Sequence, residues 1–412
     1  MSNPPPGDPP AGGDVLPLPG PVAAAGFRFA WGRRTAMLTS DGPGGGPARR
    51  FMWKKTYGKT GKSVSVIGFG AMRFPHPQDL DGSAEVVRYA HAKGINYFDT
   101  APFYCDDRSE EICGRALATL PRDSFYISTK CSEADGGKLR ASLERSLARL
   151  RVSRIDFFHI WCLLRPSDLP QRIAGGALAA AQRAQAEGLI RHLVVSTHLN
   201  GEDIAAVLAT GNFEGVTLGY NVLNFPFRAK ALEAARRHAV GVVTMNPLGG
   251  GMIPRNAARL DFLRGPRDCS VVQAALRFNV SQPAITAALV GFANNAEVDE
   301  AVAAIEDFTP YPAGHIERVQ AQLAAGFDGF CTGCGYCLPC PADLEIPKWM
   351  DVYNQRILEG SDDAMRNRLK WHWNLAPDLA ASCLQCGDCE NACTQHLPIR
   401  ERLAAIAALA GR

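Results

Sequence analysis

The 412-residue sequence lacks several features that would assign it to a familiar class of protein. It has no apolar run of about 18 residues, so we expect no membrane-spanning helix. It has no long run of Lys or Arg, and its formal net charge is only +3, which argues against a nucleic-acid partner. The Pro/Gly-rich N-terminus lacks the apolar core of a secretory signal. We therefore expect a cytoplasmic protein.

Cysteine, by contrast, is plentiful. Of 13 cysteines, eight form two tight groups near the C-terminus. The other five stand alone, and without a secretory signal such residues are typical of small buried side chains rather than of disulfides. The two groups are Cys331-Thr-Gly-Cys334-Gly-Tyr-Cys337-Leu-Pro-Cys340 and Cys383-Leu-Gln-Cys386-Gly-Asp-Cys389-Glu-Asn-Ala-Cys393.

The spacing within these groups indicates iron–sulfur ligands. Three thiolates at two-residue intervals can hold three corners of an iron–sulfur cube, and a fourth cysteine closes that cube or reaches a neighbouring one. Zinc sites usually pair two C-x2-C units across a longer loop, so zinc is the weaker interpretation. We predict two 4Fe–4S clusters, which serve electron transfer or, alternatively, a structural role. By analogy with two-cluster ferredoxins, Cys340 would join Cys383, Cys386 and Cys389, and Cys393 would join the first three cysteines.

The rest of the chain shows a regular alternation of strands and helices. Residues 1–52 are rich in Pro, Gly and Ala and are predicted to be disordered. A hairpin is predicted over 54–66. Amphipathic helices, such as those at 84–93, 109–119 and 138–150, then alternate with eight apolar strand candidates. These strands are 66–71, 97–100, 125–130, 155–161, 193–196, 216–220, 242–245 and 287–290.

Eight strand–helix pairs over roughly 250 residues are typical of a (β/α)8 barrel. A doubly wound open sheet is the alternative, but no G-x-G-x-x-G follows the first strand. Polar residues follow the strands at their C-terminal ends, where a barrel carries its active site. They are Asp99, Lys130, Ser196, Asn221 and Asn246. We predict an α/β fold: a TIM barrel over 53–309, a linker helix in 310–326, and a small, mainly α-helical ferredoxin-type domain over 327–412.

Four motifs resemble those of the aldo/keto reductase family and occur in the same order. They are Val66-Ile-Gly-Phe-Gly-Ala-Met72, Phe98-Asp-Thr-Ala-Pro-Phe-Tyr104, Ser128-Thr-Lys130 and Pro247-Leu-Gly-Gly-Gly251. The resemblance covers about 54–306. The cysteine region is similar to the C-terminal extension of a ferredoxin-containing subgroup, although Thr394 stands where that subgroup normally has proline. The resemblance implies an oxidoreductase that acts on a small carbonyl or alcohol substrate.

The same resemblance implies a catalytic set. Tyr104 would donate a proton to a carbonyl oxygen that accepts hydride. An unperturbed phenol titrates near 10, so the Lys130 ammonium would stabilise the phenolate and Asp99 would orient that lysine. Family members carry a histidine where this chain has Trp161, which we interpret as a wall of the substrate pocket. His159 lies about 6.6 Å deeper on a regular strand, so we interpret it as a hydrogen-bonded histidine inside the barrel.

The expected nicotinamide site matches the family only in part. The resemblance implies cofactor contacts from Ser196, Leu248, Gly249, Gly291 and Glu300. The residues common in the family at the nicotinamide are replaced by Thr197, Thr217 and Met245. Glu297 stands where many members have an arginine that faces the 2′-phosphate of NADPH, so NADH is the better expectation if either cofactor binds. Glycines in 247–251 would let the backbone approach a pyrophosphate.

Three functional interpretations follow. The leading one is an oxidoreductase that interconverts a carbonyl and an alcohol, with electrons passing through the clusters, NADH or NADPH as a further candidate cofactor, and a ferredoxin as a candidate redox partner. The second is a plain NAD(P)H-dependent reductase whose clusters are structural. The third is an electron-transfer or partner-binding protein with a catalytically degenerate barrel. Loss of the family histidine motivates the third interpretation, and retention of Asp99, Tyr104 and Lys130 argues against it.

Overall fold

The computed structural model describes residues 52–268, 270–306, 308–326, 331, 337–393 and 397–411. Disorder is predicted for residues 1–52, and all of these except Met52 lie outside the described residues, as do Cys334 and Thr394. Within the described parts, no helix is long and apolar enough to cross a membrane.

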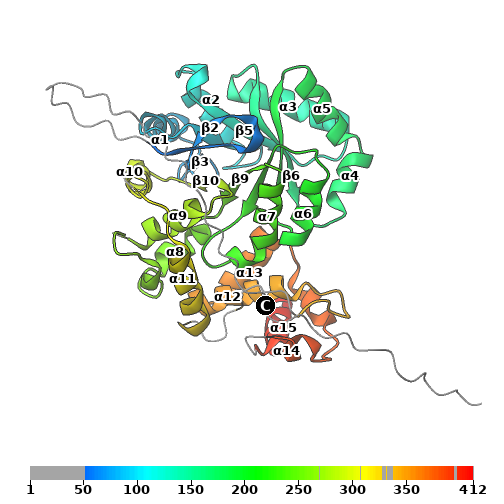
Figure 1. Cartoon of the computed structure of the whole chain (residues 1–412). Coiled ribbons are helices and arrows are strands. Elements are labelled where there is room, and N and C mark those ends of the chain that lie inside the picture. Colours follow the sequence, from blue (N-terminus) through cyan, green and yellow to red (C-terminus); the bar gives the residue numbers. More distant parts are fainter. Residues whose placement is uncertain are drawn as a thin grey trace, which may run out of the picture. The chain divides into compact units, whose positions relative to one another are not determined.

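Eight parallel strands close into a barrel in the order β10-β3-β4-β5-β6-β7-β8-β9 (Figure 1). Their bounds are β3 Ile67–Gly70, β4 Tyr97–Asp99, β5 Tyr126–Cys131, β6 Ile155–Leu163, β7 Ile190–Thr197, β8 Gly215–Gly219, β9 Gly241–Met245 and β10 Ile285–Val290. Every strand predicted from the sequence is present, with ends shifted by no more than three residues. The predicted (β/α)8 fold is therefore confirmed.

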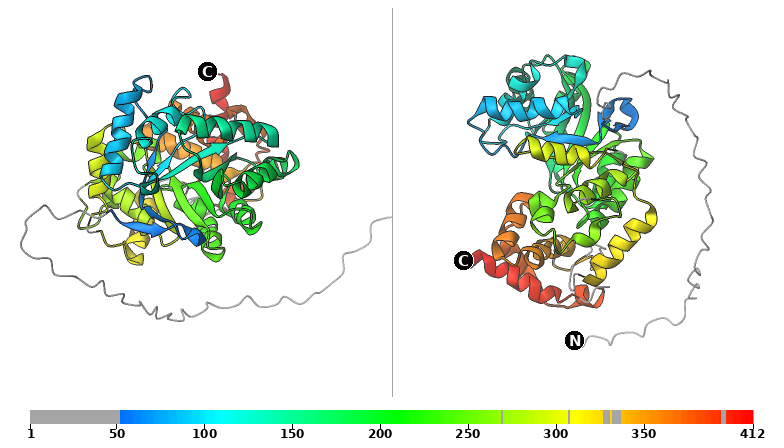
Figure 2. Two further views of the ribbon diagram at one scale, coloured as in Figure 1. Left: turned by 90° about the horizontal axis from the view of Figure 1, so that it is seen from above. Right: turned by 90° about the vertical axis from the view of Figure 1, so that its left-hand side faces the viewer.

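Helices surround the strands, as the view from above in Figure 2 shows. Those of the barrel region are α1 Leu80–Ala92, α2 Ser109–Leu117, α3 Gly136–Leu150, α4 Asp168–Ala174, α5 Ala177–Ala186, α6 Gly201–Ala209, α7 Ala229–Arg237, α8 Met252–Arg255, α9 Val271–Ser281 and α10 Asn295–Ala303. Helix α3 illustrates why they form. The Asp135 carboxylate caps it by accepting a 2.8 Å hydrogen bond from the Lys138 N–H, and Leu139, Leu143 and Leu150 at helical spacing are buried against the barrel.

The N-terminal end of the barrel is closed by a hairpin. Strands β1 (Lys54–Thr56) and β2 (Ser63–Ser65) pair antiparallel, as predicted, and present the Tyr57 ring to the barrel interior, where it is fully buried. A Cβ at Gly241 would lie 2.2 Å from Tyr57 Cδ1, and one at Gly215 would lie 2.2 Å from its Oη. The strand starts therefore need glycine to admit the ring, which leaves the opposite, C-terminal end of the barrel as the mouth.

The C-terminal segment is helical. Its elements are α11 Ala313–Gly326, α12 Ile346–Glu359, α13 Asp362–Arg368, a π-helix at Leu369–Trp373, α14 Asp388–Asn391 and α15 Ile399–Ala407. A separate apolar core holds the part after α11 together and includes Trp349, Met350, Trp373 and Leu403 as well as several cysteines, whereas Val319 and Leu323 of α11 belong to the barrel core. Polar contacts join it to the barrel region: Arg255 forms a 2.9 Å ion pair with Glu359, and Arg259 Nη1 donates to Ile357 O at 3.1 Å.

Candidate functional site

A buried ion pair occupies the C-terminal ends of β4 and β5. The Lys130 ammonium donates to both carboxylate oxygens of Asp99 and, at 2.7 Å, to Thr100 O, so its three donors are all engaged. Both side chains are about 96% buried or more. Ser128 Oγ donates to Asp99 Oδ1 at 3.2 Å from the neighbouring strand. Parallel pairing therefore brings together residues 31 positions apart, as the sequence motifs predict.

Tyr104 lies beside this pair, in the loop between β4 and α2. The Lys130 Nζ lies 5.3 Å from the centroid of the Tyr104 ring, over its face, and the Trp161 ring meets the same tyrosine edge-on at 5.7 Å. The loop has left-handed backbone at Phe103, Cys105, Asp106 and Asp107. Non-glycine residues with positive φ are uncommon and tend to gather at functional sites.

Charged contacts hold this loop in place. The Asp107 carboxylate accepts a 3.0 Å hydrogen bond from the Phe103 N–H and two 2.7 Å bonds from the Arg149 guanidinium on α3. A pocket of about 80 Å³ opens next to the loop, and Lys130 and Trp161 are part of its lining. The predicted catalytic trio and Trp161 thus share one site at the barrel mouth.

Burial dominates the electrostatics of the site. It raises the pKa of Tyr104 above the ordinary phenol value, and the negative charge of Asp99 adds to that rise. Burial also lowers the pKa of Lys130 and raises that of Asp99, while their mutual attraction opposes both shifts. Tyr104 is therefore a protonated phenol at neutral pH, and the raised pKa makes it a weaker acid than a free phenol.

His159 lies deeper in the barrel than Trp161, as its position on β6 indicates. It is fully buried, its Nε2 lies 2.9 Å from Ser128 Oγ, and burial lowers its pKa well below the ordinary value. The β6–β7 register shifts between Ile160 and Leu163, next to Trp161. His159 is thus a neutral, hydrogen-bonded histidine of the barrel interior.

The residues expected to hold a nicotinamide cofactor lie in two places, a groove after β9 and the end of β7. Leu248, Gly291 and Glu300 line one groove of about 400 Å³, which runs between the loop after β9 and helix α10. Gly249 belongs to that loop but not to the groove lining, whereas Ser196 is buried on β7. Ser196 pairs in register with Thr217 of β8, whose buried hydroxyl has no hydrogen-bond partner.

The groove has the properties that an extended nucleotide needs. Gly249, Gly250 and Gly251 all have positive φ, which only glycine adopts readily, and no heavy atom lies within 4 Å of a Cβ built on Gly250 or Gly251. The backbone is thus open to close approach by a pyrophosphate. Glu297 lines the same groove, so a 2′-phosphate there would meet a carboxylate.

Arg73 is the groove residue that sequence reasoning missed. It follows β3, lines the groove, and its Cβ lies 3.1 Å from where a Cβ of Gly291 would be. The two positions are adjacent only because β10 pairs with β3 to close the barrel. No local pattern around Arg73 signals this.

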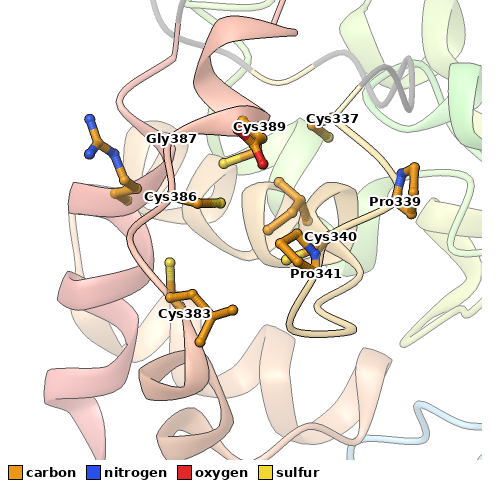
Figure 3. Close-up of a pocket in the computed structure, with 12 residues that line it drawn as sticks. Cys337, Pro339, Cys340, Pro341, Cys383, Cys386, Gly387 and Cys389 are labelled. Carbon is orange, nitrogen blue, oxygen red and sulfur yellow. The ribbon is translucent and has the colours of Figure 1, made fainter. Parts of the chain in front are cut away.

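Five of the predicted cysteine ligands line one pocket in the C-terminal segment: Cys337, Cys340, Cys383, Cys386 and Cys389. Figure 3 shows the sulfur atoms of Cys383, Cys386 and Cys389 directed into a common space that Cys340 faces from the other chain segment. Burial raises the pKa of Cys389 to about 11, and the negative charge of Glu390 adds to that rise.

Cys331 and Cys393 are not part of the lining of this pocket. Cys331 is held through its backbone by two 2.9 Å hydrogen bonds with the Asn354 side chain. Cys393 Sγ accepts a 3.5 Å bond from the Leu397 N–H. Both thiols lie within electrostatic range of Arg402, although burial is the main cause that lowers the pKa of this arginine.

The donor set fits iron–sulfur clusters better than a single metal ion. Among the described residues, no three Cys, His, Asp or Glu side chains are close enough to hold one ion. Zinc draws four ligands to about 2.3 Å from one centre, whereas a 4Fe–4S cube takes each thiolate at a different corner. The cysteines that line one pocket therefore suit the cube.

Comparison with known proteins agrees with these features. A sequence model described as "Aldo/keto reductase family" matches residues 66–323, and one described as "4Fe-4S dicluster domain" matches residues 330–397. The chain is 27% identical over 284 residues to L-galactose dehydrogenase of Arabidopsis thaliana, covering 61% of this chain and 88% of that protein. It is 25% identical over 241 residues to NADH-specific methylglyoxal reductase of Escherichia coli (strain K12), covering 52% and 72%.

Solved structures show the same barrel. An aldo-keto reductase from Bacillus halodurans in its holo form superposes with a TM-score of 0.58 at 22% identity, covering 66% of this chain and 96% of that one. A second, from Klebsiella pneumoniae in complex with NADPH, gives a TM-score of 0.56 at 22% identity and covers 66% and 95%. At this identity the likeness shows the fold alone.

Proposed function

The chain belongs to the aldo/keto reductase family and is an oxidoreductase with a 4Fe–4S dicluster domain, and from this premise we propose that it interconverts a carbonyl compound and an alcohol at Tyr104. The observation that carries the proposal is the convergence of Tyr104, Lys130 and Asp99 with Trp161 at the barrel mouth.

Each of these residues has a role in reduction. The Tyr104 hydroxyl delivers the proton that a carbonyl oxygen needs as negative charge develops on it. The Lys130 ammonium, fixed by Asp99 and Thr100, places positive charge over the Tyr104 ring and stabilises the phenolate left behind. Trp161 walls the substrate pocket and holds the ring edge-on.

In this proposal the electrons come from a nicotinamide cofactor and from the 4Fe–4S clusters. A nicotinamide supplies a hydride, and 4Fe–4S clusters supply single electrons. We assign one cluster to Cys340, Cys383, Cys386 and Cys389, which line one pocket that Cys337 also borders. We assign a second to Cys331, Cys334, Cys337 and Cys393, supported by the proximity of Cys331 and Cys393 to Arg402. A redox partner protein such as a ferredoxin exchanges electrons with the clusters.

The groove after β9 holds the adenosine side of a nicotinamide dinucleotide in this proposal, with Leu248, Gly291 and Glu300 in contact. Gly249 would contact it from the adjoining loop, and Ser196 would lie at the nicotinamide end. NADH is favoured over NADPH because Glu297 repels a 2′-phosphate. Glu297→Arg should therefore tighten NADPH binding, measured by calorimetry on anaerobic protein, and leave NADH binding nearly unchanged. Equal changes in the affinities for NADH and NADPH would show that Glu297 does not face the 2′-phosphate.

Tyr104→Phe tests the proton donor. Small aldehydes and ketones are supplied to anaerobic protein with NADH, NADPH or a reduced ferredoxin, and the variant should lose about 100-fold or more in turnover. Tyr89→Phe on α1, whose exposed hydroxyl donates to Asp299, is the matched control and should keep full turnover. Unchanged turnover in Tyr104→Phe refutes the assignment.

A second function, electron transfer or partner binding by a barrel without catalysis, is favoured by two observations. Trp161 replaces a proton-carrying histidine, and the pKa of Tyr104 is raised rather than lowered. An anaerobic titration separates the two proposals. Reduction of the clusters by NADH supports the enzyme; cluster reduction by a ferredoxin alone, without nicotinamide binding or carbonyl turnover, supports electron transfer.

A further inference from the structure

Buried polar groups without partners gather where the C-terminal segment meets the ends of β7 and β8. His198 follows β7 directly, and Gly219 ends β8 beside it. His372, from the π-helix Leu369–Trp373, lies against both: its ring centroid is 4.9 Å from that of His198, and its Cε1 is 3.3 Å from where a Cβ of Gly219 would be. Any side chain at position 219 would crowd the imidazole.

Neither ring has its hydrogen bonds satisfied. Both nitrogens of His372 are buried without a partner, and so is Nδ1 of His198. Burial, reinforced by nearby cations, lowers the pKa of His198 to about 3 and that of His372 well below its ordinary value. Both are therefore neutral at pH 7, and each can donate one hydrogen bond and accept another.

Arg228 is the charged member of the group. Its side chain is 1% exposed, and its Nε and Nη1 have no partner. Its Nη2 makes only a long, 3.4 Å hydrogen bond to His198 O, and its Cζ lies 5.7 Å from the centroid of the Trp373 ring. Burial lowers its pKa to about 10, which still leaves it charged at neutral pH.

Two neighbouring cations, unlike Arg228, are paired with carboxylates. Arg368 forms hydrogen bonds of 2.7 and 3.1 Å with Asp351, and Lys348 pairs with Glu345. In the part of the chain that the structure describes, no carboxylate lies within 4.0 Å of the Arg228 guanidinium. The carboxylates of Asp351 and Glu345 attract Arg228 from beyond that distance, but each is already paired with another cation. A buried guanidinium without a directly bonded counter-ion is unfavourable. Water could complete its hydrogen bonds but could not neutralise it.

We propose that Arg228, His198 and His372 form a binding site for a compact oxyanion, a carboxylate or a phosphate group. The guanidinium donates paired hydrogen bonds to the anion, and the imidazole of His372 supplies another. The dicluster domain contributes His372, so the site is complete only when that domain lies against the barrel.

The anion site would also bind an acidic group of the substrate, and this extension rests on the proposed function. Strand β8 is four places from β4 in the eight-strand barrel, so the anion site lies across the mouth from the Tyr104 loop. A carbonyl substrate with an acidic group could be held at both ends. The binding proposal itself does not depend on turnover.

The experiment uses anaerobically purified, cluster-loaded protein. Its thermal midpoint is followed in increasing phosphate, acetate or chloride at constant ionic strength. We expect a saturable rise with phosphate, acetate or both, beyond any rise with chloride. Arg228→Met should weaken the apparent affinity about tenfold or more, because the charged donor is lost. The matched control Arg255→Met, which removes an exposed ion pair at the same boundary, should keep the response.

The responses to the different anions show which chemical class of anion the site binds. A response to acetate alone assigns a carboxylate site, a response to phosphate alone assigns a phosphate site, and a response to both supports a general oxyanion site. No response beyond chloride in the wild type overturns the proposal. If Arg228→Met does not fold, His372→Phe replaces it, and crystals soaked in selenate give a second readout: an anomalous peak bonded to Arg228 supports the site, and only water there overturns it.

Discussion

Removing the Lys130 charge should destabilise the barrel strongly, because the Asp99 carboxylate would stay buried without its counter-ion. Lys130→Met would leave the Asp99 carboxylate buried at 4% side-chain exposure, with the 3.2 Å bond from Ser128 as its remaining hydrogen bond. A buried charge deprived of its partner costs more than the pair itself contributed.

The expected loss in free energy of unfolding is about 3–5 kcal/mol at pH 7, the range for breaking buried ion pairs. Asp99→Asn combined with Lys130→Met removes both charges and should recover roughly half of that loss or more. Burial already raises the pKa of Asp99, and loss of Lys130 raises it further. A carboxyl whose pKa is higher in the folded protein than in the unfolded chain stabilises the fold at low pH, and this stabilisation is lost as the pH rises. The loss of stability in Lys130→Met should therefore be smaller at pH 5 than at pH 8.

The measurement is native-state hydrogen exchange of backbone amides in β4 and β5, because clusters and two domains make global unfolding unsuitable for a two-state treatment. Lys93→Met is the matched control, since its ion pair with Asp299 is exposed and should contribute less than about 1 kcal/mol. A loss below about 1 kcal/mol in Lys130→Met, or a double variant no more stable than the single one, would refute the reasoning.

Three further predictions concern the mouth, the barrel base and the clusters. Because burial and a nearby carboxylate raise the pKa of Tyr104, carbonyl reduction should show no alkaline limb from this group below pH 10, as a pH–rate profile would reveal. Gly241→Ala should cost about 1–3 kcal/mol in hydrogen-exchange stability, because its Cβ would lie 2.2 Å from Tyr57 Cδ1; an unchanged value would contradict the proposed closure. Cys340→Ser should lower iron content by about one cluster, whereas Cys105→Ser should not; equal iron in both variants would exclude Cys340 as a ligand.

Much of the barrel was predictable because its signals are local. Each strand is a short apolar run bounded by polar residues, and helix α3 shows Leu139, Leu143 and Leu150 at helical spacing. Motif residues at the ends of parallel strands come together at one edge, so Asp99 and Lys130 meet as expected. The domain boundaries, the disorder of 1–52 and the catalytic roles stay predictions.

Other features depend on residues far apart in the chain. Arg73 reaches Gly291 because β10 closes on β3, and Tyr57 fits between strand starts that happen to be glycine. Nothing near Arg228 in the sequence indicates that the Trp373 ring will lie beside its guanidinium. Such contacts arise from barrel closure and domain packing, which have no local periodicity.

The sequence by itself determined the order of strands and helices, the cysteine spacing and the residue types at the mouth, because these follow from period, turn chemistry and motif. Only the tertiary structure decided the electrostatic state of those residues. Desolvation and Asp99 raise the pKa of Tyr104, and the Lys130 donors are engaged by Asp99 and Thr100. Both depend on how deeply the barrel buries each group and which charges it places nearby, and neither can be read from the order of residues.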